Sequence, residues 1–270
     1  MTHANDTLIV FVPMAYLVAL GAYLVRKRAP EALDARTPLL ATGLALVLHG
    51  ALLGVRFAMI GQLPWTNVFD VLSALAFLMT LTYALVEAAS RVAATGPDLL
   101  PMPFLLVVYA CAFGPHEPLG NPVTHTSRFV LHTVPAVSAV AALLVSGLYG
   151  VLYLRLAKAI KRKDFGPLFQ RLPNLEILAR MNFWAATIGF LLVTLGIFVG
   201  AIIAGDISGG VDVTNPKIAM TYLVWTLLLV PMIGKLTGRW PDRATARISV
   251  ITVGLIVASI LTATVMFLLG

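Results

Sequence analysis

The stretch PLLATGLALVLHGALLGVRFAMI, residues 38–60, decides the fold of this chain. As a helix rising about 1.5 Å per residue, it is long enough to cross the roughly 30 Å hydrocarbon core of a bilayer. Only His49 and Arg56 interrupt its apolar composition with ionisable side chains. The stretch therefore predicts a membrane-spanning helix that carries two polar groups in need of a partner.

Seven more apolar stretches flank it, separated by short polar segments. We expect spans at residues 7–25, 38–60, 68–89, 98–113, 129–156, 178–204, 217–236 and 247–269. The fourth is short and contains Pro101 and Pro103, which disfavour a helix interior. The predicted fold class is all-α: a polytopic transmembrane helix bundle of about eight spans, forming one domain over residues 1–270.

Basic residues alternate between the loops. Sixteen of the 19 Lys and Arg lie at 26–36, 91, 155–180 and 235–247, whereas the loops 61–67, 114–127 and 205–216 contain none. Because cytoplasmic loops are enriched in Lys and Arg, both termini are predicted to lie outside. The expected location is the cell (inner, cytoplasmic) membrane, as a multi-pass protein.

The composition limits the function classes. The chain is 59% hydrophobic and 11% charged, against about 25% charged residues in soluble domains. The net charge is +7, and most of the basic residues lie in loops or at helix ends, which predicts contact with membrane lipids and no nucleic-acid partner. The single cysteine, Cys111, excludes an intrachain disulfide. No catalytic constellation is visible in the sequence, so whether the chain is an enzyme is left open and no independent catalytic activity is expected.

The first candidate site is the pair His49 and Arg56. These residues are seven apart, so they share one helix face about 10.5 Å apart along the axis. In one interpretation His49 hydrogen bonds a neighbouring helix and Arg56 snorkels to the interface. In the other, His49 binds a metal or haem iron and the acidic edge of the cofactor meets Arg56.

The second candidate is His132, one turn inside the outer end of the fifth span, with Arg128 four residues earlier. A histidine at an apolar helix entrance beside a cation suits an interfacial ligand for an anionic cofactor. The histidines of the preceding loop, His116 and His125, are interpreted as solvated. Between the second and third spans, Asn67 is predicted to cap the next helix, with Asp70 in its first turn.

Taken together, these segments resemble the cytochrome c assembly family of the CcsA/ResC type, including its shorter HemX-like and YpjD-like members. The resemblance covers roughly residues 40–269. It rests on five features in order: His49 with Arg56, the turn Pro64–Asp70, His132–Thr133 at the head of a long helix, the stretch Gly189–Ile197, and Trp225 with Gly238 and Trp240 around a basic loop.

The resemblance implies haem handling in cytochrome c biogenesis, with one pair of axial histidines inside the membrane and another at the outer face. His49 and His132 match the first member of each pair, as metal ligands, and Arg56 and Arg128 lie beside them. The second members are not matched. Ile233 stands where the family has its second transmembrane histidine, Asn215–Ile218 replaces part of a tryptophan-rich segment, and the sequence ends at Gly270 before the family's last histidine.

The expected function is therefore binding or handling of haem b, together with a partner membrane protein of cytochrome c assembly or tetrapyrrole metabolism. Two alternatives remain: a haem-free regulatory or scaffolding subunit of the HemX-like kind, and a small-solute transporter. Met232, which follows Pro231, is a candidate ligand opposite His49, since a thioether and an imidazole are an established haem pair. Alternatively, Met232 only fills a gap in the packing.

Overall fold

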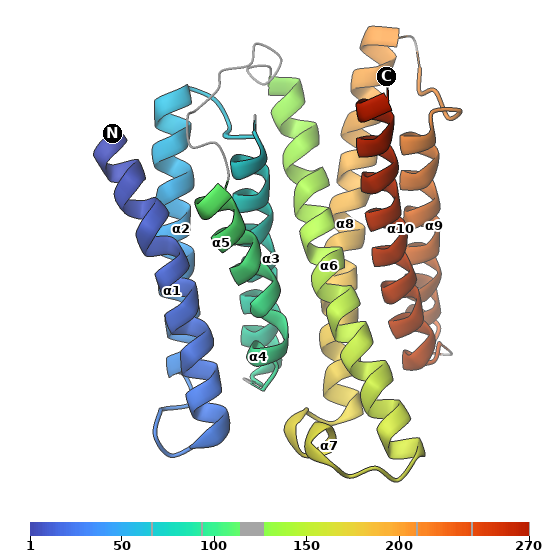
Figure 1. Ribbon diagram of the computed structural model, residues 1–270. Coiled ribbons are helices and arrows are strands. Elements are labelled where there is room, and N and C mark those ends of the chain that lie inside the picture. The colour runs from blue at the N-terminus through green and yellow to red at the C-terminus, as the bar shows by residue number, and fades with distance from the viewer. Residues whose placement is uncertain (66, 93, 114–126, 209, 239, 270) are drawn as a thin grey trace. The chain divides into compact units, whose positions relative to one another are not determined.

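The computed structural model describes the whole chain except residues 66, 93, 114–126, 209, 239 and 270 (Figure 1). Every regular element in the described part is a helix, which confirms the all-α prediction. The helices are α1 (Thr2–Arg28), α2 (Thr37–Ile60), α3 (Val68–Ser90), α4 (Gly96–Leu99), α5 (Pro101–Phe113), α6 (Ser127–Lys161), α7 (Pro167–Arg171), α8 (Leu175–Ser208), α9 (Pro216–Leu236) and α10 (Asp242–Leu269).

The expected spans agree with these helices. Among the described residues, six helices are long and apolar enough to cross a membrane, namely α1, α2, α3, α6, α8 and α9, and α5 is a shorter apolar helix. The expected span 247–269 lies within α10, whose side chains from residue 260 onward are outside the described part. The total of eight spans stays a prediction.

The fourth expected span, 98–113, is divided into α4 and α5 at Leu100. Pro101 explains the division, because it has no N–H to donate to the carbonyl of residue 97 and its ring crowds the preceding turn. The short α4 is therefore a separate helix, and it packs against α1 and α5.

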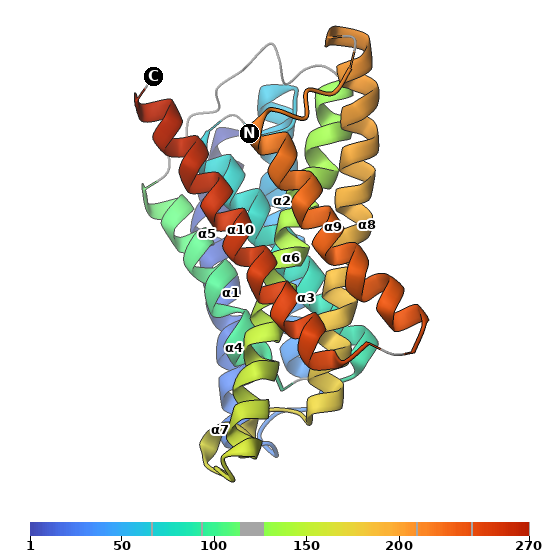
Figure 2. The same ribbon diagram turned by 90° about the vertical axis from the view of Figure 1, so that its right-hand side faces the viewer.

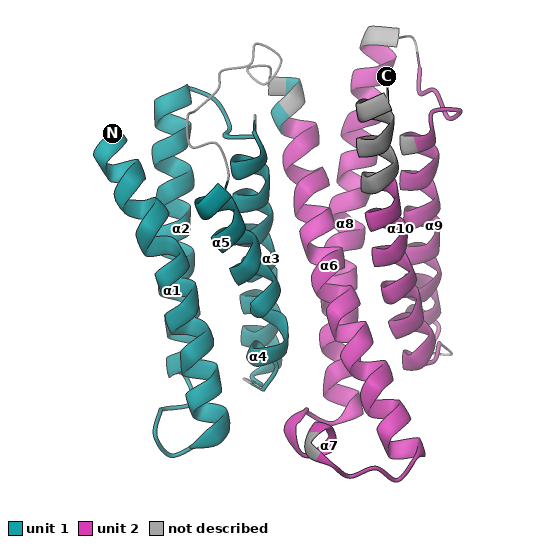
Figure 3. Ribbon diagram, in the orientation of Figure 1, with its two compact units in different colours: residues 1–130 teal, residues 131–270 magenta. Residues whose placement is uncertain are grey.

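The chain forms two compact units, Met1–Val130 and Leu131–Gly270 (Figure 3). In the first unit, α1 packs on α2, α2 on α3, α3 on α5 and α5 on α1, which closes a ring of four helices. Its core contains apolar residues from all four helices, including Val12, Leu52, Phe69 and Val107. A closed ring has an interior that lipid does not reach, so polar side chains can be held there.

The second unit contains α6 and α7 to α10, shown from a second side in Figure 2. Helices α8, α9 and α10 all pack on one another. Helix α6 joins them closely: a Cβ added at Gly147 would overlap the Val253 side chain of α10, so only glycine permits this approach. Buried hydrogen bonds link the same helices, from Asn182 on α8 to Ser146 on α6 and Ser249 on α10.

The orientation in the membrane is testable with reporter fusions. From the distribution of basic residues we expect fusions at Gly166 and Ala244 to report a cytoplasmic position and a fusion at Gly120 to report an external one. Activities of paired reporters that work on opposite sides of the membrane would measure this. The reverse pattern at all three positions would overturn the prediction that both termini lie outside.

Candidate functional site

Polar side chains gather inside the four-helix ring of the first unit. His49 and Arg56 of α2 and Asp70 of α3 are each 0% exposed. The helix face that His49 and Arg56 share, as their spacing predicts, therefore points into the ring. Asn5 and Tyr16 of α1 are also buried and face the same interior.

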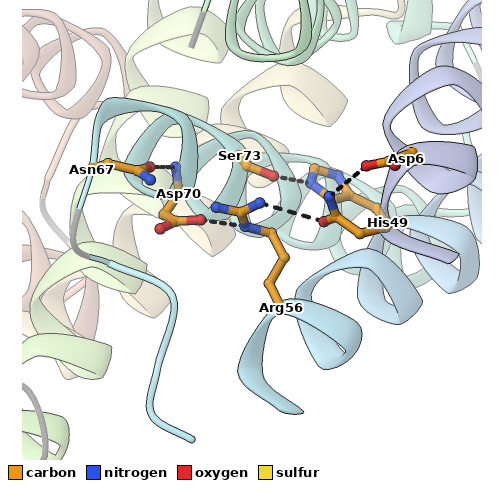
Figure 4. Close-up of polar contacts among 7 residues, drawn as sticks. Asp6, His49, Arg56, Asn67, Asp70 and Ser73 are labelled. Carbon is orange, nitrogen blue, oxygen red and sulfur yellow. Dashed lines mark hydrogen bonds and ion pairs between the residues drawn. The ribbon is translucent and has the colours of Figure 1, made fainter. Parts of the chain in front are cut away.

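Arg56 is held by an ion pair (Figure 4). Its Nε donates to Asp70 Oδ1 at 2.5 Å, and its Nη1 donates to Asn5 Oδ1 at 3.3 Å. The guanidinium carbon also lies 4.3 Å from the centre of the Phe69 ring, a cation–π contact. The interpretation that Arg56 snorkels to the interface is therefore wrong: Asp70 neutralises its charge within the ring of helices, so the side chain has no need to reach water.

The N-terminal cap of α3, which the sequence predicts, fixes the position of Asp70. Asn67 Oδ1 accepts a hydrogen bond from the Asp70 backbone N–H at 2.8 Å, which fixes the first turn of α3 (Figure 4). The carboxylate of Asp70 then faces Arg56 on α2. The sequence predicts Asp70 only in the first turn of α3, near the positive end of the helix dipole, and its role as the counter-ion of Arg56 was not predicted.

His49 uses both ring nitrogens in hydrogen bonds. Nδ1 lies 2.9 Å from Tyr16 Oη and Nε2 lies 2.8 Å from Ser73 Oγ. A neutral imidazole has one donor and one acceptor nitrogen, and two hydroxyls satisfy both. Coordination of iron by His49 would require one of these two hydrogen bonds to break, so the ligand role of His49 stays a prediction.

A cavity of about 580 Å³ lies within the second unit, among α6, α8, α9 and α10. Its walls are mostly aliphatic side chains and glycine backbone. His132, near the start of α6, also lines the cavity. Such a space suits a large, flat and largely apolar ligand.

The imidazole of His132 is oriented for coordination. Its Nδ1 lies 3.1 Å from the carbonyl oxygen of Gly196 on α8. A carbonyl oxygen only accepts hydrogen bonds, so Nδ1 carries a proton, and in the neutral imidazole Nε2 then has the lone pair. Among the described residues, none forms a hydrogen bond with that Nε2. This is the tautomer of metal-binding histidines, in which the second nitrogen donates to a backbone carbonyl.

Gly200, one turn after Gly196 on α8, makes room for this ring. A Cβ added at Gly200 would lie 3.1 Å from His132 Cε1 and Nδ1, closer than most side-chain contacts allow. The sequence contains a signal for this arrangement, because glycines four residues apart form a small helix face that permits close approach.

Met220 and Tyr222 of α9 also line the cavity and were missed. A thioether and a phenolate are both side-chain ligands of haem iron. No pattern in the sequence marks these two residues, because their place on the cavity wall depends on how α9 packs in the second unit.

The remaining predicted site residues are placed as follows. Arg128 lies on α6 one turn before His132 and is exposed. Met232 is half-buried on α9, where its Sδ accepts a hydrogen bond from Thr187 Oγ1 at 3.5 Å. His49 belongs to the first unit and Met232 to the second, and their pairing stays a prediction. The loop histidines, His116 and His125, lie outside the described residues.

Comparison with known proteins identifies the family. A family model described as "Cytochrome C assembly protein" matches residues 43–269. The chain is 28% identical over 249 residues to "Cytochrome c biogenesis protein CcsA" of Synechococcus sp. (strain CC9902), covering 82% of this chain and 80% of that relative. The protein of the same name from Mesostigma viride is 22% identical over 228 residues, covering 76% and 75%. The one from Guillardia theta is 23% identical over 219 residues, covering 74% and 72%.

The match covers most of the chain and includes both candidate histidines. The long apolar helices of this chain are those expected of a protein that crosses a membrane several times. The chain is a multi-pass membrane protein and belongs to the cytochrome c assembly protein family.

Proposed function

We propose that this protein handles haem in cytochrome c biogenesis and that its second unit holds the haem, with His132 as an axial ligand. The observation that carries the proposal is that His132, whose Nδ1 lies 3.1 Å from the Gly196 carbonyl oxygen, lines an apolar cavity of about 580 Å³. Relatives named for cytochrome c biogenesis support the choice of haem as cargo over other flat apolar molecules.

The residues present fit this cargo. The cavity volume of about 580 Å³ lies within the range of small-molecule and cofactor sites, roughly 300–1,000 Å³. Aliphatic walls suit the faces of a porphyrin, and one histidine suffices because the porphyrin supplies the other nitrogen ligands. The hydrogen bond from Nδ1 to the Gly196 carbonyl fixes the ring and makes Nε2 a stronger donor to iron.

Other residues would complete the site. Met220 and Tyr222, which line the same cavity, are the candidates for a second ligand that would hold the haem iron. Arg128, one turn before His132 on α6, is the candidate contact for the anionic propionate groups. A partner membrane protein of cytochrome c assembly would receive the haem or supply a further ligand.

A second, inner haem site with His49 as ligand is the alternative within the same function. It would need Tyr16 or Ser73 to release the imidazole, and Met232 is its proposed opposite ligand. The His49→Ala variant separates the two: partial loss of haem would indicate an inner site, and unchanged haem content would leave the second-unit cavity as the sole site.

The experiment that tests the function is an absorption spectrum of the detergent-purified protein, oxidised and then reduced with dithionite. We expect a Soret band, with visible bands that sharpen on reduction as in a haem with two axial ligands. If the protein takes up no haem when it is produced with excess haem and titrated with haemin after purification, the proposal is wrong.

A further inference from the structure

The first unit contains a second buried acid, Glu87, that has no part in the haem site. Glu87 lies one turn before the end of α3 and is 2% exposed. Tyr23 Oη of α1 donates to both carboxylate oxygens at 2.7 Å, and the hydroxyl of Tyr83 donates to Oε2. Among the described residues, no Lys, Arg or His forms an ion pair with this carboxyl, in contrast to Asp70 with its Arg56 partner.

Helix α4 and the residue before it cover the Tyr23 side of the Glu87 cluster. A Cβ added at Gly96, the first residue of α4, would overlap the Tyr23 ring, so the α4 backbone lies directly against this tyrosine. Thr95, just before α4, is 0% exposed. The division of the fourth span into α4 and α5 therefore places a short helix against Tyr23, the tyrosine that donates to the Glu87 carboxyl.

Glu87 also continues a pattern of buried polar groups. On α3, Ser73, Thr80 and Glu87 are all buried and are spaced by seven residues. On α2, the same holds for Thr42, His49 and Arg56. A spacing of seven is close to two helical turns, so each series lines one side of its helix along the interior of the ring. The Glu87 cluster is the end of this series opposite the Arg56–Asp70 ion pair.

The titratable groups around Glu87 come from all the packed helices. Its carboxyl contacts Tyr23 of α1 and Tyr83 of α3, and α2 contributes Thr42, which interacts with Tyr23. Further titratable or charged groups on these elements include Tyr16, which bonds His49; Arg26, which donates to the Leu33 carbonyl; Lys27 and Arg28 in the last turn of α1; the exposed Arg91; Asp98 of α4; and Tyr109 and Cys111 of α5. None of these side chains touches the Glu87 carboxyl.

We propose that Glu87 is a proton-binding site buried in the first unit, which exchanges its proton with water. A carboxylate without a cation is strongly disfavoured when it is buried, and uptake of a proton removes that charge. In the step a hydronium ion breaks one O–H bond and leaves as water, the proton forms one O–H bond with a carboxylate oxygen, and the cluster changes its charge from −1 to 0.

The hydroxyls around Glu87 can satisfy both charge states. With the carboxylate, Tyr23 and Tyr83 both donate to it. With the carboxylic acid, the new O–H donates to Tyr23 Oη, and the Tyr23 hydroxyl turns to Thr42 Oγ1. Thr42 accepts it because its own hydrogen is donated to the Pro38 carbonyl at 2.9 Å. A complete set of hydrogen bonds in both states is what a reversible proton site requires.

Infrared spectroscopy of the full-length protein in detergent tests the proposal without any haem readout. We expect a carbonyl stretching band of a protonated carboxyl that shifts in D₂O and is lost in Glu87→Gln. The matched control is Glu176→Gln, since Glu176 is 81% exposed in a surface ion pair with Arg180, and it should keep the band. Tyr23→Phe should move the band, because it removes one hydrogen bond from the acid.

Two results would overturn the proposal. Superimposable spectra of the wild type and Glu87→Gln from acid to alkaline pH would show that the carboxyl never binds a proton. A band that does not shift in D₂O would show that the proton does not exchange. If Glu87→Gln does not fold, Tyr23→Phe and Tyr83→Phe retain the carboxyl, and a band at the wild-type position in both would equally exclude Glu87 as its source.

Discussion

The His132→Ala variant is expected to lose haem from the purified protein. The proposed cavity offers only His132 as an imidazole ligand among its described lining residues. Substitutions of groups that merely orient a metal ligand typically lower affinity about 10–100-fold, so loss of the ligand itself should exceed that range. Haem content measured by the pyridine haemochrome spectrum, relative to protein, checks this result.

Two further variants test whether His132 binds the haem. Gly200→Ala keeps the imidazole but introduces a methyl group 3.1 Å from it, so the ring must move and haem affinity should fall by roughly tenfold or more. His3→Ala is the matched control, because His3 is an exposed histidine of α1 and its removal should change nothing. Haem content that is unchanged in His132→Ala would exclude the cavity as the haem site.

Much of the fold follows from the sequence, because burial in lipid demands long uninterrupted apolar helices. Each of the expected spans lies in a helix, and Pro101 marks the place where the fourth one divides. The cap at Asn67 was also predictable, since it depends on residues three apart in the chain. These features are local, and local features are what a single sequence reports best.

The candidate sites were predictable only in part. An ionisable residue inside a span needs a polar partner, and this rule identified His49 and Arg56 as candidate site residues. The identity of the partners could not be predicted from the sequence. Tyr16, which bonds His49, and Asp70, which pairs with Arg56, come from other helices, and their positions depend on tertiary packing. The orientation of His132 was hidden for the same reason: it depends on a backbone carbonyl, that of Gly196, which every residue type possesses.

The Asp70→Asn variant should lower the free energy of unfolding by about 3–5 kcal/mol, the usual loss when one partner of a buried ion pair is removed. Arg56 and Asp70 are both 0% exposed, so neither water nor salt compensates the charge that remains on Arg56. Arg56→Met should have a similar effect through the stranded carboxylate. Denaturant titration in micelles, followed by circular dichroism, measures the change, and Asp34→Asn in an exposed loop is the matched control.

The double variant Arg56→Met with Asp70→Leu distinguishes the stability of the pair from its role in specifying structure. Replacing both ions by apolar side chains removes the burial of charge as well as the attraction, so most of the lost stability should return. Because Asp70 also lies in the capped first turn of α3, the pair aligns α2 with α3 and sets which residues of both helices face Tyr16 of α1. We therefore expect the double variant to be stable but less uniquely packed, seen as broadened signals of His49 in NMR spectra. A double variant as unstable as Asp70→Asn would show that the ion pair itself stabilises the first unit.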